Sequence, residues 1–531
     1  MGATVQTLAT QRSQPVAAVP AGRLTIRQRW RRVRLRSYCW LLAAVCRLME
    51  LHPAVWRYAA RHYRPSLDRL AAASARAMCA LAAVDVPAYR EFLRGRGTGR
   101  HRRLADFPET DKDGYAAAYD QLSRCWRGRL PEHGVIVDES AGSSGRPFNW
   151  PRGAAELATV HYNVAGYVGL TFPMRRPFVI NAYSMGAWAT GTTTGTAMAR
   201  IAVVKNTGPD LAKIVDTLHH FGPGFDYLVT AYPPFLKHLR DRLDADGFPW
   251  PQYRISAMCG GEAMTEALRD YLQQRFALVR SGYGASDLTI GMGAETRFTV
   301  WLRRRLQTDQ PLREALLGVG EQRLPMVFQY NPLANYLEVN RRGELLCTIN
   351  NVRGVQPRLR YNVGDEALLH PYREVARLVA KDPGRWRDCR AALAGERTRL
   401  PLLLLFGRRD STVSYLGANI YPQDVEYGLY EGNPHAAAIS RFCLDLAERA
   451  DLEVRPVVHI ELREPLPVAQ RRELAGACRD GVLRHLTAVS RDFAQSLEED
   501  PAAADLQVRV HDPGEGPFDH SKLKNVYLTR S

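Results

Sequence analysis

Residues 255–287 read ISAMCGGEAMTEALRDYLQQRFALVRSGYGASD, and they place a short apolar strand, Ile255–Cys259, directly before two glycines. A segment of helical character, Thr265–Arg275, comes next, and a second glycine-rich stretch, Ser281–Asp287, closes the unit. Strands that end in glycines before a helix are typical of α/β proteins, in which ligands bind beyond the carboxyl ends of parallel strands. This stretch therefore predicts an α/β fold and a ligand-binding site at the carboxyl-end edge of its sheet.

The same alternation extends toward the N-terminus. We expect further short strands at Pro177–Asn181, Ala202–Val204 and Tyr227–Thr230. Helices such as 210–219 and 234–242 separate these strands. Strands alternating with helices predict an α/β fold with largely parallel sheets. After Gly407 the pattern changes to short α+β units. The chain therefore divides into a disordered tail (1–22), a basic helical extension (23–70), a large domain (71–406) and a small mobile α+β domain (407–531).

The charge of the chain favours acidic partners. The 531 residues carry a formal net charge of +17, and residues 23–69 hold twelve arginines against only Glu50 and Asp68. Such a balance suits nucleotides, coenzyme A, an acidic carrier protein or an anionic membrane. Because the rest of the chain is only mildly basic, we expect no nucleic acid as partner. Residues 24–64 predict one or two basic helices, either docked with a solvated arginine face or binding a membrane surface or a partner protein.

The cysteines indicate a reducing compartment. There are nine, an odd number, and none forms a Cys-x-x-Cys pair. This usage predicts buried, reduced thiols in a cytoplasmic protein and excludes a zinc knuckle. The apolar run 38–46 is too short to span a bilayer, and no signal peptide is evident.

The first motif with chemical content is Ser140–Pro147, which follows an expected strand at Val135–Asp138. Small residues let the backbone bend and bring its N–H groups to phosphate oxygens. Arg146 would add a charged donor. The Walker spacing is absent, and a loop of this composition is also compatible with an ordinary turn.

Two further motifs end strands near the centre of the chain. Gly260–Ala263 and Ser281–Asp287 both place glycines where a strand turns. Tyr283 would stack on a purine, and Ser286 with Asp287 would hold a phosphate and its Mg²⁺, which prefers carboxylate oxygen. An ordinary strand–loop–helix turn is the alternative for each motif taken alone.

The remaining motifs lie in the second half of the chain. Arg360–Asp365 places a carboxylate beside a glycine, where it would bind ribose hydroxyls. Gly407–Asp410 follows an apolar strand at 402–406, as expected of a hinge between domains. The chain has only seven lysines, and Lys522 and Lys524 are two of them, so these are less easily explained as an ordinary solvated tail.

In this order and spacing the motifs resemble the adenylate-forming superfamily of acyl-CoA synthetases, adenylation domains and luciferases, and phenylacetate–CoA ligase above all. Ser140–Pro147 is similar to the phosphate loop Ser-Ser-Gly-Thr-Thr-Gly-Lys-Pro, and Tyr283–Asp287 to Tyr-Gly-x-Ser-Glu. Arg360–Asp365 is similar to Arg-Tyr-Arg-Thr-Gly-Asp, and Gly407–Asp410 to Gly-Arg-x-Asp. Lys522 takes the place of the lysine in the family's terminal Gly-Lys pair. The resemblance covers roughly residues 75–531.

Several positions depart from the family pattern. Arg146 stands for the lysine of the phosphate loop, Asp287 for a glutamate and Ser521 for the glycine before the catalytic lysine. Residues 370–400 form an insertion, and residues 1–70 have no counterpart. The resemblance therefore predicts that residues 1–70 are dispensable for the chemistry.

The resemblance implies that ATP and Mg²⁺ bind, that a carboxylic acid is activated as an acyl-adenylate, and that coenzyme A accepts the acyl group. It implies a role for each matching residue. Lys522 would bridge the carboxylate and the α-phosphate. Ser140, Ser143, Ser144, Gly145 and Arg146 would hold the β- and γ-phosphates, Ser286 the α-phosphate and Asp287 the metal. Adenine and ribose would contact Gly261, Glu262, Tyr283, Gly284, Asp365 and Arg408.

The resemblance also implies a hinge and an acid pocket. The small domain would rotate about Arg409 or Asp410. The acid pocket would be lined by Tyr183, Met185, Trp188, Tyr232 and Pro233, an aromatic set that favours an aryl or otherwise flat acid. Two alternatives remain open: transfer of the acyl group to a carrier protein, an amine or another nucleophile, and an inactive nucleotide-binding homologue.

Overall fold

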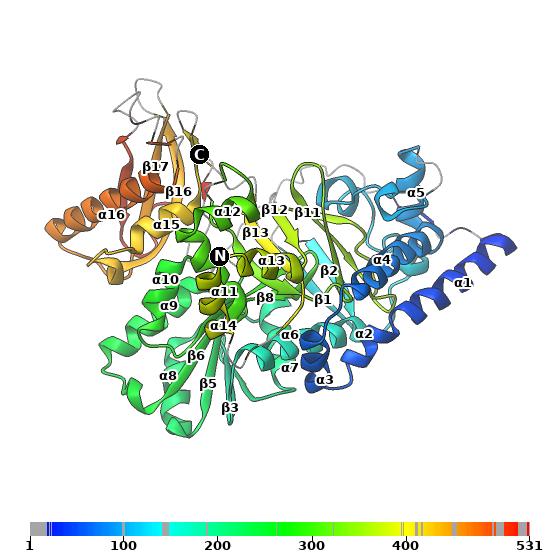
Figure 1. Cartoon of the computed structure of the whole chain (residues 1–531), viewed down its shortest axis with the longest axis horizontal. Coiled ribbons are helices and arrows are strands. Elements are labelled where there is room, and N and C mark those ends of the chain that lie inside the picture. The colour runs from blue at the N-terminus through cyan, green and yellow to red at the C-terminus, as the bar shows by residue number, and fades with distance from the viewer. Residues whose placement is uncertain are drawn as a thin grey trace, which may run out of the picture.

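The computed structural model describes residues 18–20, 22, 24–97, 101–140, 148–186, 189–261, 263–321, 323–393, 396, 398–408, 413–415, 418–448, 454–490, 493–494, 497, 504–518 and 528–529. The chain forms a large α/β body, with a smaller α+β body at one end and the helix α1 (Ile26–Leu42) projecting at the other (Figure 1).

One sheet of eleven strands organises the large body, in the order β10-β11-β12-β13-β9-β8-β7-β6-β5-β3-β4. Its strands are β3 (Pro177–Asn181), β4 (Val203–Asn206), β5 (Asp226–Ala231), β6 (Arg254–Gly260), β7 (Val279–Ala285), β8 (Thr289–Ala294), β9 (Met326–Tyr330), β10 (Asn335–Val339), β11 (Glu344–Ile349), β12 (Tyr361–His370) and β13 (Leu402–Arg408). The α/β class predicted from the sequence is confirmed.

The sheet is parallel in one half and antiparallel in the other, so the expectation of largely parallel pairing holds only for β3 to β7. From β7 onward, the neighbouring strands pair antiparallel. Connection length accounts for two of these pairings. Residues 286–288, between β7 and β8, and 340–343, between β10 and β11, are too few to carry the crossover helix that a parallel return requires. The connections from β8 to β9 and from β12 to β13 hold two helices each, so length does not decide the direction there.

Helices cover the sheet and supply its core. They are α6 (Ala154–Thr171), α7 (Ala189–Met198), α8 (Leu211–Phe221), α9 (Pro233–Ala245), α10 (Glu266–Gln273), α11 (Arg297–Thr308), α12 (Gln310–Leu317), α13 (Tyr372–Ala380) and α14 (Pro383–Ala392). In the parallel half, Val229 and Ala257 of the strands pack with Leu218, Leu239 and Leu272 of the helices. The insertion at 370–400 folds as α13 and α14, which bury Val375, Val379 and Cys389 against α11 and α12.

The smaller body has a four-stranded sheet, ordered β18-β17-β16-β19, and two helices that pack together. Its elements are β14 (Val413–Tyr415), β15 (Ala418–Ile420), α15 (Pro422–Tyr430), β16 (Ile439–Glu448), β17 (Val454–Leu462), α16 (Val468–Val489), β18 (Gln507–His511) and β19 (Leu528–Thr529). At the crossing of α15 and α16, a Cβ on Gly428 would lie 2.4 Å from the Cα of Val482. Only glycine permits this approach.

A buried lysine joins the smaller body to the large one. Lys237 of α9 donates from Nζ to the carbonyl oxygen of Ile439 at 2.9 Å and to Asp241 at 3.0 Å. Arg463 pairs with the same Asp241. Burial lowers the pKa of Lys237 to about 8, while Asp241 opposes that shift. The contact therefore fixes the start of β16 on α9.

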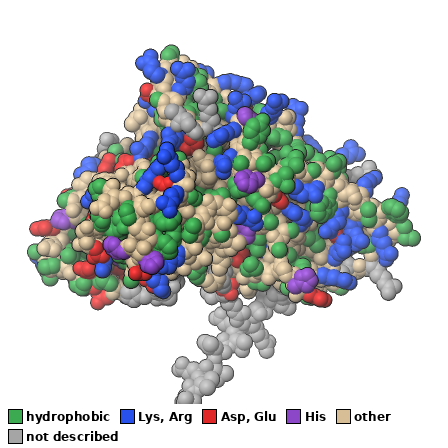
Figure 2. Space-filling view, turned by 90° about the horizontal axis from the view of Figure 1, so that it is seen from below, with side chains coloured by type: hydrophobic (Ala, Val, Ile, Leu, Met, Phe, Trp, Pro, Cys, Tyr) green, Lys and Arg blue, Asp and Glu red, His purple; other side chains and the backbone are tan. Residues whose placement is uncertain are grey.

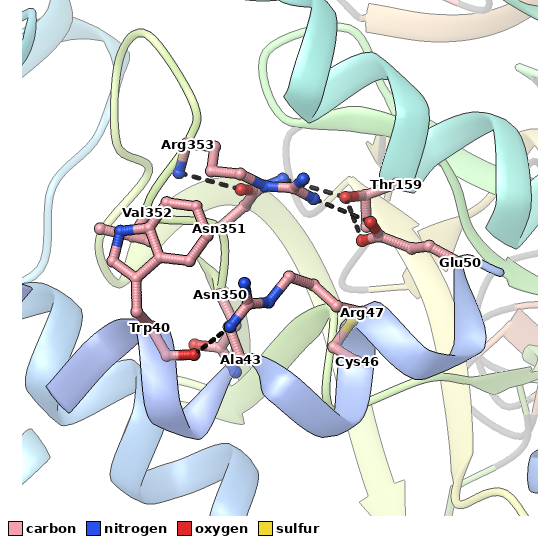
Figure 3. A pocket seen from close by; sticks show the side chains of 10 residues that line it. All are labelled: Trp40, Ala43, Cys46, Arg47, Glu50, Thr159, Asn350, Asn351, Val352 and Arg353. Atoms are coloured by element: carbon pink, nitrogen blue, oxygen red, sulfur yellow. Dashed lines mark hydrogen bonds and ion pairs between the residues drawn. The ribbon is translucent and has the colours of Figure 1, made fainter. Parts of the chain in front are cut away.

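Three N-terminal helices occur where the sequence predicted one or two. α1 is followed by α2 (Ala44–Met49) and α3 (Pro53–Arg61), then by α4 (Ser66–Asp85) and α5 (Pro87–Gly95). α3 starts anew because His52 caps it and Pro53 occupies its first turn, where a missing N–H costs nothing. Ion pairs and hydrogen bonds hold α2: Glu50 accepts from Thr159 of α6 at 2.6 Å and from Arg353 at 2.8 Å (Figure 3).

α2 and α3 belong to the core of the large body. Trp56 is 1 % exposed, and its Nε1 donates to Asn163 of α6 at 2.8 Å. A Cβ on Gly166 would lie 2.3 Å from the Trp56 ring, so the indole fills the space that glycine leaves. This packing contradicts the premise that residues before 70 are separate from the large body. Removing residues 1–70 would expose its core.

Replacing Trp56 with alanine is expected to lower the free energy of unfolding by about 3–5 kcal/mol, because a large buried side chain is lost from a close-packed site. Urea unfolding followed by circular dichroism measures the change. The control is Tyr58→Ala on the same helix, where the side chain is 66 % exposed and the expected change is within about 0.5 kcal/mol. Equal losses in the two variants would contradict the assignment of α3 to the core.

Candidate functional site

The strands β1 (Val135–Ser140) and β2 (Phe148–Gly153) form an antiparallel hairpin in which Ser140 pairs with Phe148. The hairpin brackets residues 141–147, which lie outside the described residues. The phosphate-binding roles of Ser143, Ser144, Gly145 and Arg146 therefore stay predictions, as does that of the Ser140 side chain.

Arg152 fixes the hairpin to the loop between β7 and β8. Its guanidinium is buried and lies 2.8 Å from Asp138 and 3.4 Å from Glu156. It also donates to the carbonyl oxygen of Ser286 at 2.7 Å and to that of Leu288. Burial raises the pKa of Asp138, and the charge of Arg152 opposes this rise. The backbone of the Ser286–Asp287 segment is therefore held by a charge on the hairpin.

The carboxylate of Asp287 lies among groups from three other segments. Tyr361 donates its hydroxyl to Asp287 at 3.0 Å, and the Nζ of Lys112 is 3.9 Å away. Lys112 belongs to a single π-helical turn, Lys112–Ala116, and also lies 5.0 Å from the ring centroid of Phe148. Arg358 donates to the carbonyl oxygen of Asp287 at 2.9 Å. Lys112 therefore lies close both to Phe148, the first residue after the predicted phosphate loop, and to Asp287, the predicted metal ligand.

Tyr283 and Asp365 meet directly, although 82 residues separate them in sequence. The Tyr283 hydroxyl donates to Asp365 at 2.6 Å. Burial raises the pKa of Tyr283 well above its usual value, and Asp365 raises it further, so the phenol keeps its proton. Asp365 is the register partner of Arg408 in the pairing of β12 with β13. The motif predicted to bind adenine and the motif predicted to bind ribose are thus in direct contact.

Glycines shape the same edge of the sheet. Gly261 has φ +85°, a conformation that side chains rarely adopt. A Cβ on Gly284 would lie 2.7 Å from the Cα of Ile290, so the two strand ends touch there. Both glycines belong to the glycine-rich segments that predicted a ligand-binding edge of the sheet.

Two of the predicted acid-pocket residues contact each other. The rings of Tyr183 and Tyr232 are 5.1 Å apart in an edge-to-face arrangement, and both are buried. A Cβ on Gly260 would lie 3.2 Å from the Tyr183 hydroxyl, so this pair adjoins the glycine edge. Pro233 begins α9 directly after Tyr232, and Met185 lies near Gly191 and Gly208. The structure describes no contact between Met185 and the two tyrosines.

Some predicted site residues lie outside the described part of the chain. They are Trp188, Glu262, Arg409, Asp410 and Lys522, together with the side chain of Arg408. Their roles as pocket lining, nucleotide contacts, hinge and catalytic lysine stay predictions.

Four residues of the site were not given a role from the sequence: Lys112, Arg152, Arg358 and Tyr361. The scarcity of lysine was a usable signal for Lys112, since only seven occur in the chain. Arg152 and Arg358 had no such signal among so many arginines. Their importance comes from burial, which only the fold reveals.

The donor set fits an anionic ligand. Arg358 is buried, and burial together with the charge of Arg152 lowers its pKa to about 10. Within the described residues, its Nη2 has no hydrogen-bond partner. A buried guanidinium with an unused donor suits a phosphate oxygen, and the Nζ of Lys112 lies 3.9 Å from the Asp287 carboxylate. The site therefore has cationic groups where a triphosphate is expected.

The site also fits Mg²⁺ held jointly with phosphates. The part of the chain that the structure describes contains no group of three or more His, Cys, Asp or Glu side chains placed to hold a metal. Mg²⁺ commonly binds through one or two carboxylates plus the substrate's phosphates. Asp287 would supply that carboxylate.

The sequence matches no protein-family model and no curated protein. Among solved structures, it is similar to 2-hydroxyisobutyryl-CoA ligase in the postadenylation state in complex with R3-HIB-AMP. The TM-score is 0.63, at 16 % identity, over 89 % of this chain and 91 % of that one. The same ligase with 2-HIB-AMP gives 0.59, at 16 % identity, over 88 % and 90 %. With 2-HIB-AMP and CoA in the thioesterification state it gives 0.51, at 15 % identity, over 89 % and 91 %.

These comparisons define the class of fold. The chain has the adenylate-forming fold, including its C-terminal domain. Its structural neighbours are acyl-CoA ligases that were solved with acyl-AMP intermediates.

Replacing Arg152 with methionine is expected to lower the free energy of unfolding by about 3–5 kcal/mol, because Asp138 is left buried without its cation. The double variant Asp138→Asn with Arg152→Met is expected to recover part of that loss. Urea unfolding measures both. The control is Arg254→Met, which breaks a half-exposed pair with Asp226 and should cost about 1 kcal/mol or less. No recovery in the double variant would contradict the pairing.

Proposed function

We propose that this protein activates a carboxylic acid with ATP, forming an acyl-adenylate and pyrophosphate, and then transfers the acyl group to the thiol of coenzyme A. The observation that carries the proposal is the 2.6 Å hydrogen bond between Tyr283 and Asp365. It joins two motifs that were predicted separately to bind adenine and ribose. The fold supports it, because the similar ligases were solved in complex with acyl-AMP.

The reaction has two balanced steps. In the first, a carboxylate oxygen bonds to the α-phosphorus of ATP, and the bond from that phosphorus to the bridging oxygen of pyrophosphate breaks. In the second, the sulfur of the thiol attacks the acyl carbon, AMP leaves, and the thiol proton is lost to solvent. Both steps need two anions brought together and charge neutralised, which positioned cations provide.

The described residues supply distinct parts of that task. Tyr283 fixes the carboxylate of Asp365, which would take the ribose hydroxyls next to Arg408. Arg358, which donates to the carbonyl oxygen of Asp287, and Lys112, which lies beside its carboxylate, would bind the phosphates. When bound, Mg²⁺ would neutralise phosphate charge beside Asp287. Lys522 would bridge the carboxylate and the α-phosphate.

The acid is proposed to be aryl or otherwise flat, as for phenylacetate–CoA ligase. The edge-to-face pair Tyr183 and Tyr232 supports this, since two predicted pocket residues are aromatic, lie in contact and adjoin Gly260. The reaction is placed in the cytoplasm, in keeping with nine cysteines that are all free and buried. A carrier-protein thiol or an amine is the alternative acceptor, and the assay below distinguishes it.

Pyrophosphate release from ATP and Mg²⁺, measured across a panel of aryl, aliphatic and amino acids, tests the proposal. We expect release with an aryl acid and a thioester, seen by mass spectrometry, only when coenzyme A is added. Lys522→Ala should lower adenylate formation by at least about a hundredfold while ATP still binds. Lys524→Ala is the matched control and should keep the wild-type rate.

Three outcomes of that assay would count against the proposal. Release indifferent to coenzyme A would move the acceptor to a carrier protein or another nucleophile. Near-wild-type release by Lys522→Ala would remove this lysine from the mechanism. ATP binding without release for every acid would favour an inactive nucleotide-binding protein.

Replacing Tyr283 with phenylalanine should raise the KM for ATP about fivefold, because one hydrogen bond worth about 1 kcal/mol no longer orients Asp365. The KM for the acid should stay unchanged. The ring keeps its stacking on Phe328, whose centroid is 5.7 Å away. Tyr253→Phe removes a hydroxyl that donates to Leu218 and should leave both constants unaltered. An equal effect of the two variants would show that Asp365 does not depend on Tyr283.

A further inference from the structure

The helix α1 has an inward face that is firmly docked. Its Cys39 is buried in a cluster with Met78 and Leu81 of α4. Arg32 and Arg36 of the same helix lie 3.5 and 3.6 Å from the carboxylate of Asp85 at the end of α4. These contacts set the rotation of α1 about its axis. The opposite face must therefore point away from the protein.

That opposite face carries an apolar stripe. Ile26, Trp30, Val33 and Leu41 are 75 %, 73 %, 52 % and 70 % exposed. Their spacing of four, three and eight residues puts them on one side of a helix with about 100° per residue. Large apolar side chains exposed together in this way are typical of a binding face, because water solvates them poorly. α1 therefore has two apolar faces, and the described part of the chain covers only one.

Arginines border the stripe on both sides. At about 100° per residue, Arg27, Arg31 and Arg34 flank one edge and Arg29 the other. Within the described residues, none of these four pairs with a carboxylate, and α1 contains no acidic residue. Figure 2 shows basic and hydrophobic side chains intermixed at the end of the molecule where α1 lies. The exposed face thus combines apolar side chains with unneutralised positive charge.

We propose that α1 binds the surface of an anionic lipid bilayer, lying in its plane. The stripe would enter the boundary between headgroups and acyl chains, where tryptophan is favoured. The flanking guanidinium groups would bind lipid phosphates. A second copy of this chain fits poorly, because a two-fold contact would set arginines against arginines.

Among the helices that the structure describes, no single one is long and apolar enough to cross a bilayer, although the bent pair α4 and α5, at 95°, passes by length and composition. Side chains of that pair, such as Ala75, Leu81 and Tyr89, are buried inside the protein. The lipid contact is therefore assigned to α1.

Cosedimentation of the full-length protein with vesicles tests the proposal. Vesicles of phosphatidylcholine alone are compared with vesicles that also contain phosphatidylglycerol, at low and high salt. We expect sedimentation with the anionic vesicles only, weakened by salt because screening shortens electrostatic attraction. Arg27→Gln, Arg31→Gln and Arg34→Gln together should lower vesicle partitioning at least about tenfold. Ile26→Ser, Trp30→Ser and Val33→Ser together should lower it similarly.

A matched variant controls for charge alone. Arg373→Gln, Arg377→Gln and Arg390→Gln remove three exposed arginines on α13 and α14, and should leave partitioning nearly unchanged. Thermal midpoints of all variants should match the wild type, since the altered side chains are exposed. The proposal is overturned if no vesicle sediments the protein, if neutral vesicles do so equally, or if the control loses as much. Light scattering that shows a stripe-dependent dimer, or retention on an acidic carrier protein without vesicle binding, would also overturn it.

Discussion

The candidate site depends on the buried guanidinium of Arg152. A charge out of contact with water is tolerated only when other groups neutralise it, and Asp138 and Glu156 do so from β1 and α6. The same group binds the main chain at Ser286 and Leu288. One side chain therefore joins the hairpin, a core helix and the loop that carries Asp287.

Near Arg152, the positive charges of Arg358 and Lys112 are held at fixed positions beside Asp287. Most arginines of the chain lie on the surface, where salt and water weaken their fields. Arg358 is different because it is buried, and its charge acts through a medium less polarisable than water. Together with Lys112, which lies beside the Asp287 carboxylate, Arg358 forms a fixed cationic environment for an anion. Such an environment needs little reorganisation when charge develops on a phosphorus atom.

Local pattern predicted the parallel half of the sheet well, because its strands are short, apolar and separated by helices. The strand expected at Pro177–Asn181 has those bounds in the structure. The antiparallel half was less accessible, since pairing direction depends on connection length and on strands distant in sequence. The sequence also identified Tyr283 and Asp365 as site residues, but not their hydrogen bond. Lys112 and Arg358 were missed because their roles follow from burial and from tertiary contact.

The start of the sequence was the hardest part to interpret. Its arginines pointed either to docked helices with a solvated arginine face or to a helix that binds a membrane surface or a partner, and α1 has both a docked face and an exposed one. Trp56 and Met49, by contrast, are core residues embedded in a basic segment. Composition averages over such positions, so it could not separate a docked helix from an exposed one a few residues earlier.

The joint made by Lys237 has a consequence for how the chain can change over generations. Apart from Asp241, its Nζ binds the main-chain oxygens of Ala437 and Ile439, which every amino acid possesses. Point substitutions at positions 437 and 439 therefore leave these two hydrogen bonds intact, whereas a deletion or insertion between the two carbonyls would change their spacing. Arg463 differs, because its side chain makes the contact with Asp241. For the two main-chain hydrogen bonds, evolutionary drift is thus free in residue type and constrained in length.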